Sequence, residues 1–327
     1  EAFKYLEKAA SMDHASANYM IGNMFVRGLL GNKSNEELEK GYKYLLKSYE
    51  LGNVAASNLI GNMYLNGIYP LEKNIENAKE FYSKAANNNY AYAFNNLGRI
   101  EEDNNNFKGA FDYYLQSANL GESWACNKVA EAYRLGVVDK DMDKVYYYYT
   151  RALENNYRTL CFYAYYNLAK YFYMNGYDKY SKDINKAIEY YKKALELQPM
   201  AYCAYRIYYC NKEMGNYAQA LEYIDYAIEM DSTDADDLLM RADLLYYMGR
   251  NEECMQTVGK YIEHQPDFFF GYYRRGFYKD NTRDIEGAIE DYTMSIELAP
   301  GYAYAYLGRA DMYALKGDKE ASEADYR

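Results

Sequence analysis

The sequence is poor in the residues on which most enzyme active sites depend. It contains two histidines, four prolines and one tryptophan in 327 residues. The histidines, His14 and His264, stand near opposite ends of the chain. No phosphate-binding glycine loop, metalloprotease helix motif or nucleophile elbow occurs in it. We therefore expect no enzymatic activity, no cofactor and no metal site.

Excess basic charge and long apolar runs are also missing. The net charge is −11, whereas nucleic-acid binding needs a basic surface that displaces counterions. No run approaches the roughly 18 apolar residues of a membrane span. We therefore expect neither a nucleic-acid partner nor a membrane-spanning segment.

The five cysteines do not form a disulfide or zinc framework. Cys203 and Cys210 lie on one predicted helix, about 10 Å apart along its axis, which is too far for a disulfide. Free, mostly buried thiols favour a reducing, cytoplasmic compartment.

Small residues recur at regular intervals and divide the chain into pairs of helices. One series marks the first helix of each pair: Gly22, Gly61, Gly98, Ala130, Ala169, Tyr208, Ala242, Gly276 and Ala310. A second series marks the following helix: Ala9, Ser48, Ala85, Ser117, Ala152, Ala194, Ala227, Tyr261 and Ser295. Small side chains allow two helix backbones to approach closely. We call these positions the first and second markers.

The intervals between the markers predict the architecture. The shortest distance from first to second marker is 19 residues, as from Gly98 to Ser117, and longer intervals contain polar, glycine-containing loops. The return from second to first marker takes 13 residues early in the chain and 15 near its end. These periods predict an all-α protein without a β-sheet, built as one continuous solenoid of about nine antiparallel helical hairpins over residues 1–327.

The later part of the chain resembles tetratricopeptide repeats. Its 34-residue period runs over residues 201–327, with Gly249 at one turn and Pro266 and Pro300 at the ends of two units. The family's tryptophan is replaced, at the corresponding positions, by Ala204, Leu238, Tyr272 and Tyr306.

The earlier part resembles the related SEL-like repeats over residues 1–160. The supporting residues include Gly-Asn-Met-Tyr at 61–64, Ala78, and Lys-Ala-Ala at 84–86. Residues 161–200 form a transitional repeat with a loop insertion at 176–179. Together the resemblances imply a right-handed superhelix whose first helices line a concave groove.

One face of the first helices is rich in aromatic and amide side chains. Aromatic residues stand six positions before the first marker in six repeats, and asparagines three before it in three successive repeats. Asparagine amides can grip a peptide backbone, and tyrosines add contact area at low entropic cost. The candidate groove residues are Asn58, Asn95, Asn127, Trp124, Tyr163, Tyr166, Tyr173, Tyr202, Tyr205 and Tyr209.

This face has other interpretations. The aromatic side chains could pack against the neighbouring repeat, and the asparagines could reflect the general asparagine richness of the chain. We expect Tyr166, Tyr173, Tyr205 and Tyr209 to be partly exposed, with Asn95 and Asn127 opening onto the same channel. The function that follows is a scaffold or adaptor for a protein or extended peptide. A glycan-binding solenoid, or an interaction part of a larger enzyme, is the alternative.

Two further expectations concern helix contacts and the chain ends. Arg275 and Arg309 precede first markers in repeats that carry an aspartate sixteen residues later, so we expect the pairs Arg275–Asp291 and Arg309–Asp325 to join two helices. Residues 1–11 and 319–327 look like second helices cut short. Without polar capping units, such ends are expected to expose apolar faces and to permit end-to-end self-association.

Overall fold

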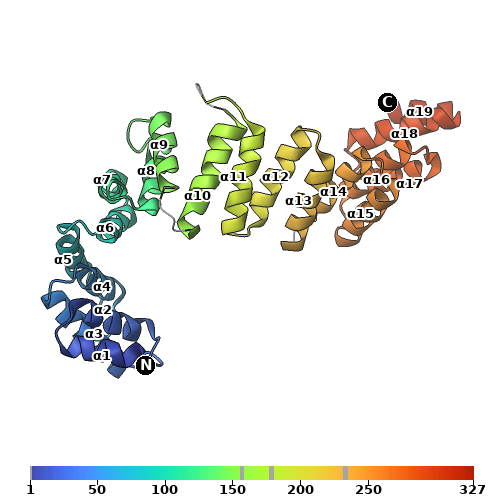
Figure 1. The fold of residues 1–327 in the computed structure, drawn as a ribbon. Helices are drawn as coiled ribbons and strands as arrows, with labels where there is room; N and C mark the ends of the chain where they lie inside the picture. The colour runs from blue at the N-terminus through green and yellow to red at the C-terminus, as the bar shows by residue number, and fades with distance from the viewer. Residues whose placement is uncertain (1, 155–157, 177–179, 231–234) are drawn as a thin grey trace. The chain divides into compact units, whose positions relative to one another are not determined.

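A computed structural model describes residues 2–154, 158–176, 180–230 and 235–327. The described residues form nineteen α-helices and one short π-helix, with no β-strand (Figure 1). The chain divides into two compact units, Glu1–Leu168 and Ala169–Arg327. None of the helices in the described ranges is long and apolar enough to cross a membrane.

The first unit consists of ten helices. They are α1 (Ala2–Ser11), α2 (Ala15–Arg27), α3 (Asn35–Glu50), α4 (Val54–Asn66), α5 (Ile75–Ala86), α6 (Ala91–Asp103), α7 (Phe107–Asn119), α8 (Ser123–Leu135), α9 (Met142–Ala152) and α10 (Arg158–Leu168). After α1, the helices pair as α2/α3, α4/α5, α6/α7 and α8/α9.

The second unit begins with a π-helix, η1 (Ala169–Met174), which continues α10 in the chain. It then contains α11 (Ile184–Leu197), α12 (Ala201–Glu213), α13 (Tyr217–Met230), α14 (Asp236–Tyr247), α15 (Asn251–His264), α16 (Phe269–Asn281), α17 (Ile285–Leu298), α18 (Ala303–Lys316) and α19 (Lys319–Tyr326).

The predicted all-α fold of about nine antiparallel helical hairpins is confirmed for the described residues. Eight hairpins lie wholly within one unit, and η1 pairs with α11 within the second unit. The prediction of one continuous solenoid over residues 1–327 stays a prediction. Residues 177–179 of the predicted loop insertion lie outside the described residues.

Polar side chains start the helices and glycines end several of them. Ser34 and Glu37 form a capping box at the start of α3, satisfying two backbone N–H groups. Asn53 caps α4 by accepting a hydrogen bond from the Ala56 N–H. Gly28 follows α2 in the left-handed conformation, φ 72°, which a residue with a Cβ rarely adopts.

The small first markers make room for a ring from the second helix. A Cβ on Gly61 would lie 2.6 Å from a ring atom of Tyr82, and one on Gly98 would lie 2.5 Å from a ring atom of Tyr114. Each ring stands three residues before the second marker. Eight of the nine residues at this position are buried, Leu6 being half-buried; the eight are Leu45, Tyr82, Tyr114, Tyr149, Tyr191, Ile224, Val258 and Tyr292.

Two of the three serines at second markers, Ser48 and Ser117, join the two helices of a hairpin, whereas the buried Ser295 hydroxyl has no hydrogen-bond partner among the described residues. The Ser48 hydroxyl donates to the Ala15 carbonyl oxygen at 2.7 Å, and the Ser117 hydroxyl donates to the Ala91 carbonyl oxygen at 2.9 Å. These bonds satisfy buried hydroxyls without introducing charge.

Both arginine–aspartate pairs expected from the sequence are present in the second unit. Arg275 donates from Nε and Nη2 to Asp291 at 2.9 and 2.6 Å. Arg309 donates to both Asp325 oxygens at 2.7 and 2.8 Å. Each pair joins the two helices of one hairpin in bidentate geometry, which fixes their register.

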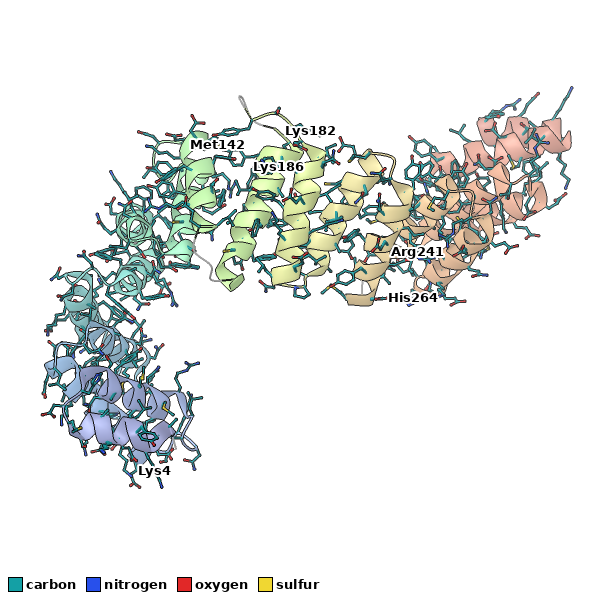
Figure 2. The ribbon with its side chains drawn as sticks, in the orientation of Figure 1. Lys4, Met142, Lys182, Lys186, Arg241 and His264 are labelled. Carbon is teal, nitrogen blue, oxygen red and sulfur yellow. The ribbon has the colours of Figure 1, made fainter. Side chains whose placement is uncertain are left out.

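A third arginine shows that this arrangement repeats. Arg241, labelled in Figure 2, donates to Asp225 at 2.7 Å and to Thr257 at 2.5 Å. These partners stand sixteen residues before and after it, on α13 and α15. Arg309 likewise donates to Thr293, sixteen residues before it, at 3.0 Å. Arg241 and Arg309 therefore each link the second helices of two successive hairpins, whereas Arg275 has Gly259 at the earlier position.

The five cysteines are buried thiols, as the sequence suggested. Burial raises the pKa of Cys203 and of Cys254 to about 12 and that of Cys210 to about 11. These thiols are therefore protonated near neutral pH and pack as small apolar groups.

Candidate binding surfaces

The three asparagines predicted to line the groove, Asn58, Asn95 and Asn127, are buried between helices. Asn95 donates to the Glu122 carboxylate at 2.9 Å, and Asn58 accepts from Asn96 at 2.9 Å. Asn95 is 7% exposed and Asn127 is 8% exposed. The expectation that Asn95 and Asn127 open onto a channel is therefore wrong. A buried amide needs a partner, and a neighbouring helix supplies one to each of Asn58 and Asn95.

A hydrogen-bonded network in the first unit explains part of this burial. Asn96 on α6 donates to Asn58 and, at 3.2 Å, to Asn62 on α4. The Tyr82 hydroxyl on α5 donates to the same Asn62 oxygen at 2.7 Å. The amides thus join α4, α5 and α6. Asn96, which stands one residue after Asn95, was not among the predicted groove residues.

Tyr173 is also buried, at 7% exposure. It lies in η1, with its ring against Tyr190 of α11 at 5.0 Å between centroids and with Lys186 Nζ 4.5 Å from its ring centroid. Figure 2 shows Lys186 near the start of α11. The expected partial exposure of Tyr173 is therefore wrong, because η1 packs against α11 and covers this ring.

Other aromatic side chains on the first helices stay accessible. Tyr163 on α10 is 53% exposed, and Tyr92 and Tyr304 are exposed at the same position of their hairpins, six before the first marker. Trp124, at that position of α8, is half-buried; its ring makes an edge contact with Tyr114, and Lys128 Nζ lies 5.3 Å from its centroid.

Three predicted tyrosines share one face of α12. Tyr202 and Tyr205 are half-buried and Tyr209 is exposed; their spacing of three and four residues places them on one side of the helix. The Tyr205 hydroxyl donates to Asp237 on α14, and the Tyr209 hydroxyl lies 3.9 Å from the Met240 sulfur. On α10, half-buried Tyr166 stacks on Phe162. Laterally supported rings of this kind suit a contact surface.

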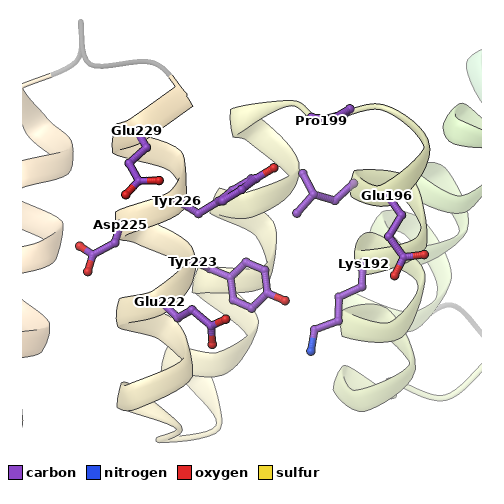
Figure 3. A pocket seen from close by; sticks show the side chains of 9 residues that line it. Lys192, Glu196, Pro199, Glu222, Tyr223, Asp225, Tyr226 and Glu229 are labelled. Carbon is purple, nitrogen blue, oxygen red and sulfur yellow. The ribbon is translucent and has the colours of Figure 1, made fainter.

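A groove lies between two second helices, on residues that the sequence analysis did not select. It has a volume of about 650 Å³ and lies between α11 and α13 (Figure 3). Its lining combines carboxylates, two tyrosines, one lysine and two apolar residues: Lys192, Leu195, Glu196, Pro199, Glu222, Tyr223, Asp225, Tyr226 and Glu229.

Only some of the charged side chains in this groove have a partner of opposite charge. Asp225 accepts from Arg241 at 2.7 Å and points away from Lys192 (Figure 3). Lys192 Nζ lies 5.5 Å from the ring centroid of Tyr223. Glu196, Glu222 and Glu229 are exposed and form no ion pair with the described residues. The described residues contain no group of three acidic, cysteine or histidine side chains arranged to hold a metal ion.

Six stretches of the chain match the family model named Sel1 repeat: residues 1–14, 15–53, 54–90, 88–122, 125–157 and 162–199. Together these stretches cover more than half of the chain. They include the transitional repeat, and the described helices follow the same hairpin boundaries. No curated protein matches the sequence.

Two solved structures share the fold. The first is c5321, a protective antigen present in uropathogenic Escherichia coli strains that displays an SLR fold; it is 17% identical, with a TM-score of 0.60 over 99% of this chain and 71% of that chain. The second is a Sel1 repeat protein from Oxalobacter formigenes, 21% identical, with a TM-score of 0.57 over 70% of this chain and 94% of that chain. At these identities the likeness concerns architecture alone.

Proposed function

The chain belongs to the Sel1 repeat family, and we propose that it is a scaffold that binds protein or peptide partners through exposed rings on its first helices. Repeat scaffolds of this kind generally serve protein interaction. The observation that carries the proposal is the exposure of Tyr92, Tyr163 and Tyr304 at one repeated position. Packing alone does not require exposed rings there, whereas a partner gains contact area from them.

The burial of the asparagines limits which side chains can contact a partner. Asn58, Asn95 and Asn127 would have gripped a peptide backbone or a sugar, but their side chains are enclosed by the helices. The rings, rather than the amides, are therefore the contact groups in this proposal. The glycan alternative loses the amide donors on which it depended.

The finer division of the chain is also part of the proposal. We take residues 201–327 to be a tetratricopeptide-like zone that follows the Sel1 repeats. Its support is the 34-residue period together with the arginine contacts at sixteen residues, which occur on α14, α16 and α18.

A matched pair of tyrosines tests the first-helix surface. Tyr163 on the first helix α10 and Tyr147 on the second helix α9 are both 53% exposed. Peptides would be selected from a random library on the whole chain, and their affinity measured by fluorescence anisotropy. Tyr163→Ala should weaken binding by about 1–3 kcal/mol, whereas Tyr147→Ala should leave it within about 0.5 kcal/mol.

Two results would count against the proposal. One is an equal loss of peptide affinity in the two variants, because it would show that the ring on the first helix contributes no more to binding than the ring on the second helix. The other is a library that yields no peptide with measurable affinity for the parent chain.

A further inference from the structure

The groove between α11 and α13 carries chemistry that the first-helix surface does not use. Glu222, Asp225, Tyr226 and Glu229 stand at spacings of three, four and seven residues, so they form one stripe on α13. Lys192, Leu195, Glu196 and Pro199 repeat the same spacings on the facing side. The first helix α12 contacts both α11 and α13, and the two stripes face each other across the groove.

Neighbouring second helices lack this combination of side chains. Tyr226 stands one residue before the second marker, where α11 has Lys193, α15 has Lys260 and α17 has Met294. Tyr223 stands four before the marker, where α15 has Thr257. Rings at both positions therefore occur on α13 alone among the second helices of this unit that carry both positions, since α11 has Tyr190 but Lys193.

The contact of Lys192 with Tyr223 shows that a ring in this groove can bind a cation. The Lys192 ammonium lies 5.5 Å from the centroid of Tyr223, within the range of a cation–π contact. Tyr226, 37% exposed, offers a second ring between Glu222 and Glu229, and no cation of the described residues lies on it. Leu195 and Pro199 also line the groove and add apolar surface beside these charges.

We propose that this groove binds a short basic segment of a partner protein, with an arginine or lysine side chain over Tyr226 between Glu222 and Glu229. Three carboxylates without an ion pair attract the cation, and the rings and apolar surface contact its aliphatic part. Seven residues of helix measure about 10 Å, which accommodates about three residues of extended chain. This site is separate from the first-helix surface and stands or falls independently of it.

A charge-matched pair of variants tests the carboxylates. The probe is a fluorescein-labelled hexapeptide in which arginine alternates with leucine; the control peptide has neutral citrulline in place of arginine. Glu222→Gln combined with Glu229→Gln should weaken binding of the arginine peptide roughly fivefold. Glu290 and Glu297 occupy the equivalent positions of α17 and are equally exposed. Their double glutamine variant changes the net charge by the same amount and should change the affinity less than about twofold.

The ring and the lysine provide two further variants. Tyr226→Ala should weaken binding roughly tenfold, whereas Met294→Ala, at the equivalent position with 38% exposure, should not. Lys192→Met removes a competing cation from the Tyr223 ring and should strengthen binding about two- to fivefold. A merely structural lysine would not give stronger binding when replaced.

Three outcomes overturn the proposal. The citrulline peptide binds as tightly as the arginine peptide, the α17 double variant loses as much affinity as the α13 double variant, or Lys192→Met weakens binding. All substituted side chains lie on the helix surface, and far-UV circular dichroism of each variant verifies that the fold is unchanged. Retained binding of library-selected peptides to Tyr226→Ala would show that the first-helix surface works without the groove.

Discussion

The two units share the same helical hairpins but differ in the polar contacts that join the two helices of a hairpin. In the first unit, a buried tyrosine of the second helix reaches a polar group on the first: Tyr82 donates to Asn62 and Tyr114 donates to Glu102, each at 2.7 Å. In the second unit, arginines on the first helices form ion pairs, as in Arg275–Asp291. The spacing of small residues is common to both units, but the groups that fix the helix register are not.

This difference shows that the same repeat period is compatible with different interhelical contacts. A small first marker sets how closely two helices approach, and Gly98 and Gly276 do so in the two units with a tyrosine facing each. The polar contacts beside that position then determine what happens when one partner is removed. Removing a neutral hydroxyl leaves no unpaired charge, whereas removing a carboxylate leaves partly buried cations without their anion.

The largest expected effect comes from Asp291 in the second unit. Its carboxylate is 3% exposed and accepts from Arg275 and from Lys279, the latter at 2.9 Å. Asp291→Ala leaves two partly buried cations without their anion and should lower the free energy of unfolding by about 3 kcal/mol. Urea denaturation followed by circular dichroism measures the loss, and amide hydrogen exchange should place it in α16 and α17.

The neighbouring Glu290 provides the control for this substitution. It is exposed on the same helix, and Glu290→Ala should change the free energy of unfolding by less than about 0.5 kcal/mol. A loss below about 1 kcal/mol for Asp291→Ala would contradict a register-fixing role for the ion pair.

A smaller effect is expected when the two glycine markers are compared. A Cβ on Gly98 would lie 2.5 Å from a ring atom of Tyr114, and one on Gly276 would lie 3.0 Å from a ring atom of Tyr292. Tyr114 cannot move freely, because it is bonded to Glu102 and packs against Trp124. Gly98→Ala should therefore destabilise the chain by about 2 kcal/mol, even after the gain of about 1 kcal/mol in helix propensity.

At Gly276 the same gain in helix propensity should nearly offset the free-energy cost of a small movement of the Tyr292 ring. Gly276→Ala should leave the free energy of unfolding within about 0.5 kcal/mol of the parent. Equal losses at the two glycines, measured by urea denaturation, would show that the closer approach in the first unit is not energetically important.

Much of the fold could be predicted from sequence because it depends on local spacing. The spacing of the small markers predicted the hairpins, and the joint presence of Arg275 and Asp291 predicted an ion pair between two helices. The contact of Arg241 with Asp225 was missed, because that partner precedes it and belongs to another hairpin.

The candidate site was predicted less well, because exposure depends on neighbours far away in the chain. Asn95 is a polar residue on the expected face, yet Glu122, 27 residues later, covers its amide. The groove at Tyr226 was missed for a similar reason. Its two stripes belong to α11 and α13, and only their spatial relation reveals that their side chains meet.

The smallest expected effect isolates the hydroxyl contact that distinguishes the first unit. Tyr114→Phe keeps the ring that faces Gly98 and removes only the donor to Glu102, which retains Lys128 at 2.8 Å. The loss should be about 1 kcal/mol. The corresponding Tyr292 hydroxyl has no hydrogen bond among the described residues, so Tyr292→Phe should change the free energy of unfolding by less than about 0.5 kcal/mol. Combining Tyr114→Phe with Glu102→Ala should cost less than the sum of the two single changes, because both remove the same hydrogen bond. Additive losses in that double-mutant cycle would mean that the hydroxyl and the carboxylate act separately, and the contrast between the two units would then rest on ring packing alone.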